Sequence, residues 1–69
     1  MDKTEKVESL FFKKIQKPKN FDQIKIYNVF DNRYRINVWV NLTENGLDKK
    51  KIHSSYFARL NEDELNIIN

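Results

Sequence analysis

The 69-residue sequence contains no cysteine, one histidine, one glycine and one proline. Without cysteine the chain forms no disulfide and offers no thiolate as metal ligand or nucleophile. One histidine excludes a His-rich metal site, and one glycine excludes a Gly-rich phosphate loop and a dinucleotide fingerprint. Apolar runs are as short as Leu10-Phe11-Phe12, far from the roughly 20 residues of a transmembrane helix. These absences predict a protein with no cofactor, no evident small-molecule substrate and no membrane span.

The chain is expected to form one small domain over residues 1–69. A domain of this size buries only about 60% of its unfolded surface, and its core contributes roughly 3–5 kcal/mol. Apolar residues (39%) and charged residues (33%) are balanced as in a packed domain rather than a disordered chain. Met1–Glu5 is polar and mixed in charge, unlike a secretory signal, which predicts a cytoplasmic location.

The composition is also biased, and the charge is unevenly distributed. Asn, Lys and Ile supply 26 of the 69 residues, a bias typical of an AT-rich bacterial or phage coding sequence. Of the net charge of +3, residues 1–9 carry −1, residues 10–59 carry +7 and residues 60–69 carry −3. The middle of the chain is therefore far more basic than the total indicates.

The first predicted element is a helix at about residues 4–16. Val7, Leu10, Phe11 and Ile15 recur at helical spacing on one face. Asp2 or Thr4 is expected to cap its start. Pro18 disfavours helical backbone at the residue before it, so we expect the helix to end near Gln16.

Three strands are predicted after the helix, at about residues 23–30, 33–42 and 51–60. The clearest alternation lies in the second strand, where Tyr34, Ile36, Val38, Val40 and Leu42 share one face. Residues 43–50 are expected to be a loop with Asn45-Gly46 as its tightest turn. Residues 65–68 are expected to be either a short fourth strand or a tail.

The first hairpin has two available registers. A two-residue Asp31-Asn32 loop pairs Tyr27 with Ile36, whereas a three-residue loop that includes Phe30 pairs Ile26 with Ile36. We favour the second register because it places the isoleucines of both strands on one side, and because Asn32 tolerates the left-handed position that such a loop requires.

The resulting fold class is α+β, with the N-terminal helix packed on one face of a three- or four-stranded antiparallel β-meander. The predicted core contains Val7, Leu10, Phe11, Ile15, Ile24, Ile26, Ile36, Val38, Val40, Ile52, Tyr56 and Leu60. This core is thin for the entropy of ordering the chain, so a partner or a second copy is expected to cover the other face of the sheet.

That uncovered face is predicted to combine aromatic rings with cations and to carry no acid. The candidate binding residues are Lys25, Tyr27, Arg33, Arg35, Trp39, Lys51, His53, Phe57 and Arg59. Cations follow phosphates and exposed rings stack on bases, which is typical of proteins that bind single-stranded nucleic acid. The same rings and cations are also typical of ordinary cross-strand packing and of protein interfaces.

No catalytic or metal-binding group emerges from the sequence. Neighbouring residues of a strand point to opposite faces, so His53 and Ser54 are not expected to form a nucleophile–base pair. Glu62, Asp63 and Glu64 are consecutive, which is typical of a solvated turn rather than of a hard-metal loop. We therefore expect a non-enzymatic binding or regulatory protein that recognises a protein partner or forms a homodimer. Binding of single-stranded nucleic acid is the alternative.

Overall fold

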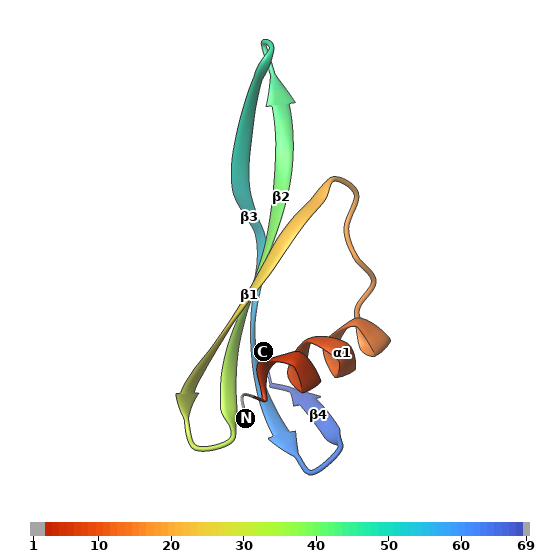
Figure 1. Ribbon diagram of the computed structural model, residues 1–69, viewed down its shortest axis with the longest axis vertical. Helices are drawn as coiled ribbons and strands as arrows, with labels where there is room; N and C mark the ends of the chain where they lie inside the picture. Colours follow the sequence, from red (N-terminus) through yellow and green to blue (C-terminus); the bar gives the residue numbers. More distant parts are fainter. Residues whose placement is uncertain (1–2, 69) are drawn as a thin grey trace.

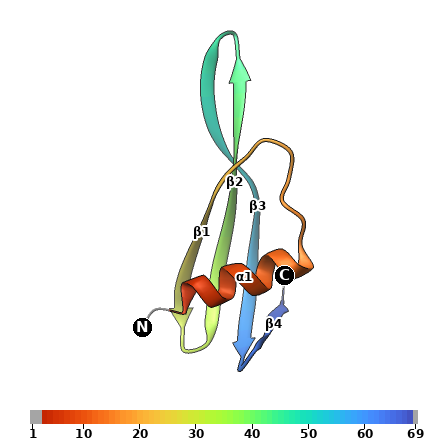
Figure 2. The same cartoon turned by 45° about the vertical axis from the view of Figure 1, so that its right-hand side comes forward.

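The computed structural model describes residues 3–68 and contains one helix and one sheet (Figure 1). The elements are α1 (Thr4–Lys14), β1 (Phe21–Phe30), β2 (Arg33–Glu44), β3 (Leu47–Asn61) and β4 (Glu64–Ile67). The strands pair antiparallel in the order β1-β2-β3-β4, and α1 lies across one face of this open sheet (Figure 2). The predicted α+β fold is confirmed, and the last segment is a strand rather than a tail.

The helix α1 is held by its apolar side, and it ends earlier than predicted. Val7 and Phe11 are fully buried against the sheet. The backbone turns extended at Ile15, whose N–H donates to the carbonyl of Phe11 at 2.9 Å, so α1 ends two residues before Gln16. Lys3 occupies the N-cap position without a side-chain cap, and Thr4 is the first helical residue. The predicted cap at Asp2 lies outside the described residues.

The first hairpin has the favoured register but a different turn. Ile26 pairs with Ile36. The strands nevertheless continue to a pair between Phe30 and Arg33, which leaves a two-residue turn. The register is kept because the ladder shifts between Asn28 and Phe30, so that Val29 is an extra, bulged residue. The positive φ falls on Asp31 (50°) rather than on the predicted Asn32, and Asn28 Nδ2 donates to the Asp31 carbonyl at 2.8 Å.

The second hairpin is longer than predicted. Residues 43–50 were expected to form a loop, but the ladder continues to a pair between Glu44 and Leu47. Asn45 and Gly46 both have positive φ (53° and 77°), the conformation of a two-residue turn that matches strand twist. Because β1 reaches only as far as Val40, residues 42–49 project beyond the sheet as a two-stranded ribbon, here called the hairpin arm (Figure 1, top).

A second bulge, in β3, changes the side of the sheet on which the residues before it lie. The ladder pairs Val38 with Ser54 and then Trp39 with Ile52, so His53 is the extra residue of a bulge. Ile52 therefore lies beside Trp39 on the uncovered face and is 42% exposed, and its prediction as a core residue is wrong. Lys51 pairs with Val40 and is displaced to the face that α1 covers.

The core lies between α1 and the lower part of the sheet. Its buried residues are Val7, Phe11, Tyr34, Ile36, Val38, Val40, Ala58, Leu60 and Leu65. The ring of Phe11 meets the ring of Tyr56 edge-on at 5.3 Å between centroids. Leu10, Ile15, Ile24, Ile26 and Tyr56 are partly buried around this cluster. Tyr34, Ala58 and Leu65 are core residues that the prediction did not include.

Candidate binding face of the sheet

The sheet face opposite α1 is uncovered, and we call it the open face. Residues that pair directly across an antiparallel ladder share a face. On this basis the open face holds Lys25, Tyr27, Phe30, Arg33, Arg35, Asn37, Trp39, Ile52, Ser55, Phe57, Arg59 and Asn66. It therefore contains seven of the nine predicted binding residues, because the bulge in β3 moves Lys51 and His53 out of the alternating pattern.

The lower half of the open face holds exposed apolar side chains beside its arginines. Phe30 is 68% exposed and Ile68 is 60% exposed. Ile68 extends the line of β4, and its N–H donates to the Phe57 carbonyl at 2.7 Å. Together with Val29 and Arg33, these side chains line a shallow groove of about 410 Å³. Large apolar side chains gathered in one groove are typical of an interaction surface rather than of scattered surface residues.

Four cations surround the rings of this face. Lys25 Nζ lies 5.3 Å from the centroid of the Trp39 ring, and Arg35 Cζ lies 5.3 Å from that of Phe57. Arg33 is paired directly with Arg59 across β2 and β3. Like charges in this position are destabilising.

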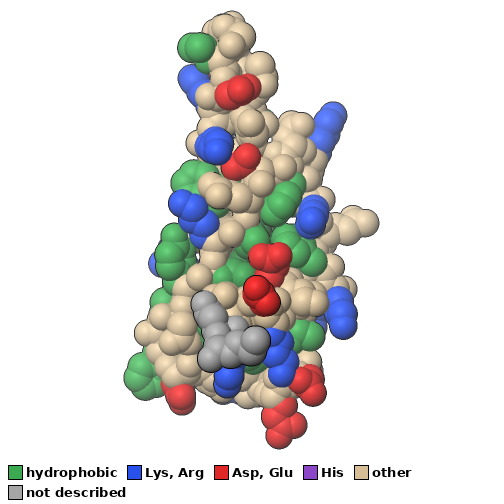
Figure 3. Space-filling view, in the orientation of Figure 1, with side chains coloured by type: hydrophobic (Ala, Val, Ile, Leu, Met, Phe, Trp, Pro, Cys, Tyr) green, Lys and Arg blue, Asp and Glu red, His purple; other side chains and the backbone are tan. Residues whose placement is uncertain are grey.

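No described carboxylate neutralises these four cations. The ion pairs among residues 3–68 join Lys6 to Asp63, Lys49 to Glu44 and Lys50 to Asp22, so none of them involves one of these four cations. Glu64 pairs with Asn61 at the lower end of the same side, but it makes no ion pair. In Figure 3 acidic side chains are visible on the arm, across the middle and at the lower end, so the molecule as a whole is not short of acids. The four cations therefore give this part of the open face a net positive charge.

Trp39 is a poorer stacking platform than the sequence suggests. Its side chain is half-buried, and Lys25 lies over its ring. The Trp39 Nε1 and the Asn41 Oδ1 are shielded from solvent and have no hydrogen-bond partner among the described residues. Phe30, Tyr27 and Phe57 are the more accessible rings of this face, and Arg35 lies over Phe57.

His53 and Ser54 lie closer together than strand geometry predicts. Their Nδ1 and Oγ atoms are 3.2 Å apart because the bulge at His53 interrupts the alternation of side chains. The expectation that they point to opposite faces is wrong. A nucleophile–base pair also needs a group that orients the base, and no other described side chain hydrogen-bonds to His53. The contact lies on an exposed strand, and Ser55 donates instead to Asn37 Oδ1.

Sequence reasoning missed the apolar part of the face. Phe30 was assigned to a turn, Ile52 to the core, and Ile68 to a strand or tail of unassigned face. Two bulges and the pairing of β4 decide these positions, and none of them leaves a local signal in the sequence. The alternating pattern did place the seven aromatic and basic residues of β1, β2 and β3 on this face.

The described part of the chain shows neither a metal-binding cluster nor a membrane-spanning helix. Between residues 3 and 68 no group of three His, Asp or Glu side chains is arranged to hold a metal ion. The one described helix is too short and too polar to cross a bilayer.

The chain matches no protein-family model, no curated protein and no solved structure. Inference about its function therefore rests on the open face itself.

Proposed function

We propose that this chain is a non-enzymatic binding protein that recognises an acidic surface of another protein through the open face. The observation that carries the proposal is the direct pairing of Arg33 with Arg59 without a neutralising carboxylate. This arrangement costs stability in the free protein. A partner carboxylate placed between the two guanidinium groups relieves their repulsion and accepts charge-assisted hydrogen bonds from both.

The groove beside the arginines favours a protein as the partner. Phe30, Phe57 and Ile68 present an apolar surface that a large apolar side chain of a partner can cover. Interfaces derive most of their binding energy from such central apolar and aromatic contacts, surrounded by polar groups and arginines. An acidic segment with one apolar anchor matches both parts of the open face.

Single-stranded nucleic acid is the second candidate. Tyr27 and Phe57 are exposed rings among cations that no described carboxylate neutralises, which is the combination that such ligands require. It ranks second because Trp39 is half-buried beneath Lys25, and because Ile68, which is 60% exposed, offers a nucleic acid neither a stacking ring nor a charge, although Phe30 is a further exposed ring.

A homodimer that pairs two open faces is disfavoured by charge. It would bring the cations of one copy against those of the other, and like charges across an interface reduce affinity. We therefore expect a monomer at low salt, with a mass near 8.4 kDa on a sizing column. A stable species near twice that mass would contradict this expectation.

The test places a photo-crosslinking phenylalanine analogue at Phe57 and, as a control, at Phe12 on the helix side. The test variant, called the arginine variant, carries Arg33→Gln and Arg59→Gln. The matched control carries Lys13→Gln and Lys14→Gln, which removes the same charge from the exposed end of α1. We expect one dominant adduct from position 57, which is lost in the arginine variant and kept in the lysine control.

Digestion of the adduct decides its class. An adduct that survives nuclease and is removed by protease supports a protein partner, and the opposite result supports nucleic acid. A nucleic-acid ligand should also bind with an affinity that falls steeply with salt, which fluorescence anisotropy of a labelled oligothymidylate measures. Equal crosslinking from positions 57 and 12, or no loss in the arginine variant, would refute the open face as the binding surface.

A further inference from the structure

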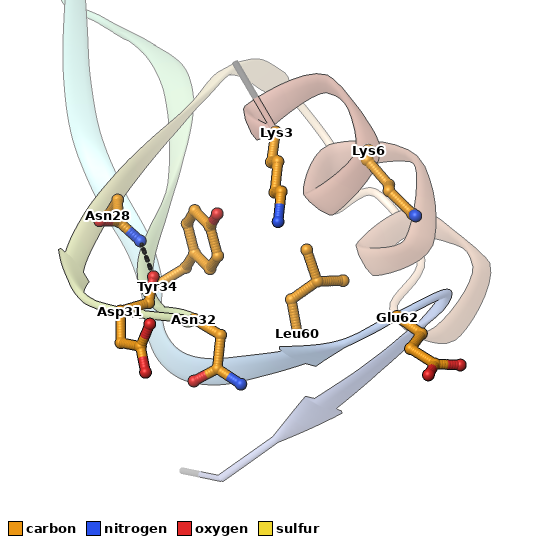
Figure 4. A pocket seen from close by; sticks show the side chains of 8 residues that line it. All are labelled: Lys3, Lys6, Asn28, Asp31, Asn32, Tyr34, Leu60 and Glu62. Atoms are coloured by element: carbon orange, nitrogen blue, oxygen red, sulfur yellow. Dashed lines mark hydrogen bonds between the residues drawn. The ribbon is translucent and has the colours of Figure 1, made fainter. Parts of the chain in front are cut away.

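A second feature of the molecule lies away from the open face, at the lower end of the core. The start of α1, the β1–β2 turn and the β3–β4 turn enclose a hollow of about 490 Å³ (Figure 4). Lys3, Asn32, Tyr34, Leu60 and Glu62 are among the residues that line it. This hollow is on the side of the sheet that α1 covers, so a ligand here would not compete with a partner on the open face.

Tyr34 places an unpaired polar group at the wall of this hollow. Its side chain belongs to the core and is only 5% exposed. Its hydroxyl nevertheless makes no hydrogen bond to any described residue. Figure 4 shows this hydroxyl pointing into the hollow, on the side where Lys3 extends its ammonium group. Tyrosine hydroxyls in cores usually have a partner; this one is not sealed from solvent, so it remains able to donate to a ligand in the hollow.

The start of α1 adds positive potential to the same place. Lys3 makes no ion pair with a described carboxylate, whereas Lys6 is engaged by Asp63 at 2.6 Å. Lys3 is also the N-cap residue and provides no side-chain cap. The dipole of the helix favours negative charge near this end.

The other charged groups around the hollow limit the charge of a ligand. Lys6 is already engaged by Asp63, so the carboxylates of Asp31 and Glu62, which also line the hollow, face only the ammonium of Lys3. They disfavour a multiply charged anion, whereas a singly charged group beside Lys3 is attracted by the ammonium and by the helix start. Asn28 is not available as a donor because its Nδ2 already donates to the carbonyls of Asp31 and Arg33.

We propose that the hollow binds a small, singly charged oxyanion, either a carboxylate or a phosphate group, between the Tyr34 hydroxyl and the Lys3 ammonium. The hydroxyl donates to one oxygen of the anion and the ammonium donates to another. Binding gives the unpaired Tyr34 hydroxyl an acceptor and gives Lys3 a counter-ion. The hollow is large enough for the anionic group together with a small organic part.

The test is a titration followed by the amide NMR shifts of the whole chain, at constant ionic strength and pH 6. Sodium acetate is the carboxylate probe, inorganic phosphate is the phosphate probe, and sodium chloride is the control. We expect saturable shifts at residues 3–6, 32–34 and 60–62 with at least one oxyanion and none with chloride. Which of the two oxyanions binds more tightly identifies the source of the anionic group.

Two variants test the assigned donors. Tyr34→Phe keeps the buried ring and removes the hydroxyl, and Lys3→Gln removes the charge. Each is expected to weaken binding about fivefold or more, as the loss of one hydrogen bond to an ion predicts. The matched control is Tyr27→Phe on the open face, which should bind as the parent does. Equal binding by the parent and Tyr34→Phe, or shifts indistinguishable from those with chloride, would overturn the proposal.

Discussion

The packing of α1 makes a strong prediction about Phe11, because this one side chain fills the centre of a thin core. Phe11 is fully buried and touches the rings of Tyr56 and Phe12 at centroid distances of 5.3 and 5.4 Å. Phe→Ala at such a site costs about 3–5 kcal/mol. A chain of this length has roughly 3–10 kcal/mol of unfolding free energy in total. We therefore expect Phe11→Ala to lose half or more of the stability.

The assay is urea unfolding, followed by far-UV circular dichroism and by the fluorescence of Trp39. With a slope of about 1 kcal/mol per molar urea for a small domain, the midpoint should fall by about 3 M or the native baseline should disappear. Phe11→Leu keeps the protein measurable if the alanine variant does not fold, with an expected loss of about 1 kcal/mol or somewhat more.

The matched control is Phe30→Ala, which makes the same chemical change at a side chain that is 68% exposed on the open face. We expect it to cost less than about 1 kcal/mol, because little apolar area returns to water. Equal losses in the two variants, or a loss below about 1 kcal/mol for Phe11→Ala, would refute the arrangement in which α1 covers one face and leaves the other open.

Three further predictions concern the turns and the open face. Gly46→Ala should lower the unfolding free energy by about 1 kcal/mol, because φ is +77° but the added Cβ meets no atom within 4 Å; an effect near zero would contradict this backbone conformation. Asp63→Asn should lower the urea midpoint slightly at pH 7 and not at pH 2. The Lys6 ammonium, by hydrogen bond and charge, holds the pKa of Asp63 below its ordinary 3.8, so the stabilisation exists above that value and is lost as the pH falls through the lowered pKa. A midpoint loss that persists at pH 2 would assign Asp63 a role other than this ion pair. Trp39→Phe should change the unfolding free energy by less than about 1 kcal/mol, because it removes the shielded indole N–H that has no partner; a loss above about 2 kcal/mol would show that this group is bonded.

The central strand and the side of the sheet that α1 covers could be predicted from residue spacing. Tyr34, Ile36 and Val38 alternate with polar residues over a long run, and only one pairing of β1 puts Ile26 on the same side. The apolar spacing of Val7 and Phe11 then assigns α1 to that side. These features were predictable because burial of one face fixes them, whatever the details of the turns.

The bulges and the second hairpin could not be predicted. Val29 and His53 are ordinary strand residues by type, and only the fit of neighbouring strands makes them the extra residues of the ladder. For this reason the alternating pattern assigned Trp39 and Phe57 to the side of the sheet on which they lie, but assigned Ile52 to the opposite side. Residues 43–50 carry few apolar side chains, so their pairing rests on the Asn45-Gly46 turn and on the strands that lead into it, not on burial.

The pairing within the hairpin arm determines which insertions and deletions the chain can accept there. Each residue of β2 beyond Val40 pairs with one residue of β3, so removing Leu42 and Thr43 together with Asp48 and Lys49 shortens the arm by two rungs and keeps the pair beside the turn in the same phase of the alternating ladder. The register and the faces of everything below are then unchanged. Removal of a single residue from only one side would instead force a new bulge or turn every later side chain to the opposite face. Insertions and deletions in this segment are therefore expected to be tolerated in matched pairs, while the strands beneath α1 keep a fixed length.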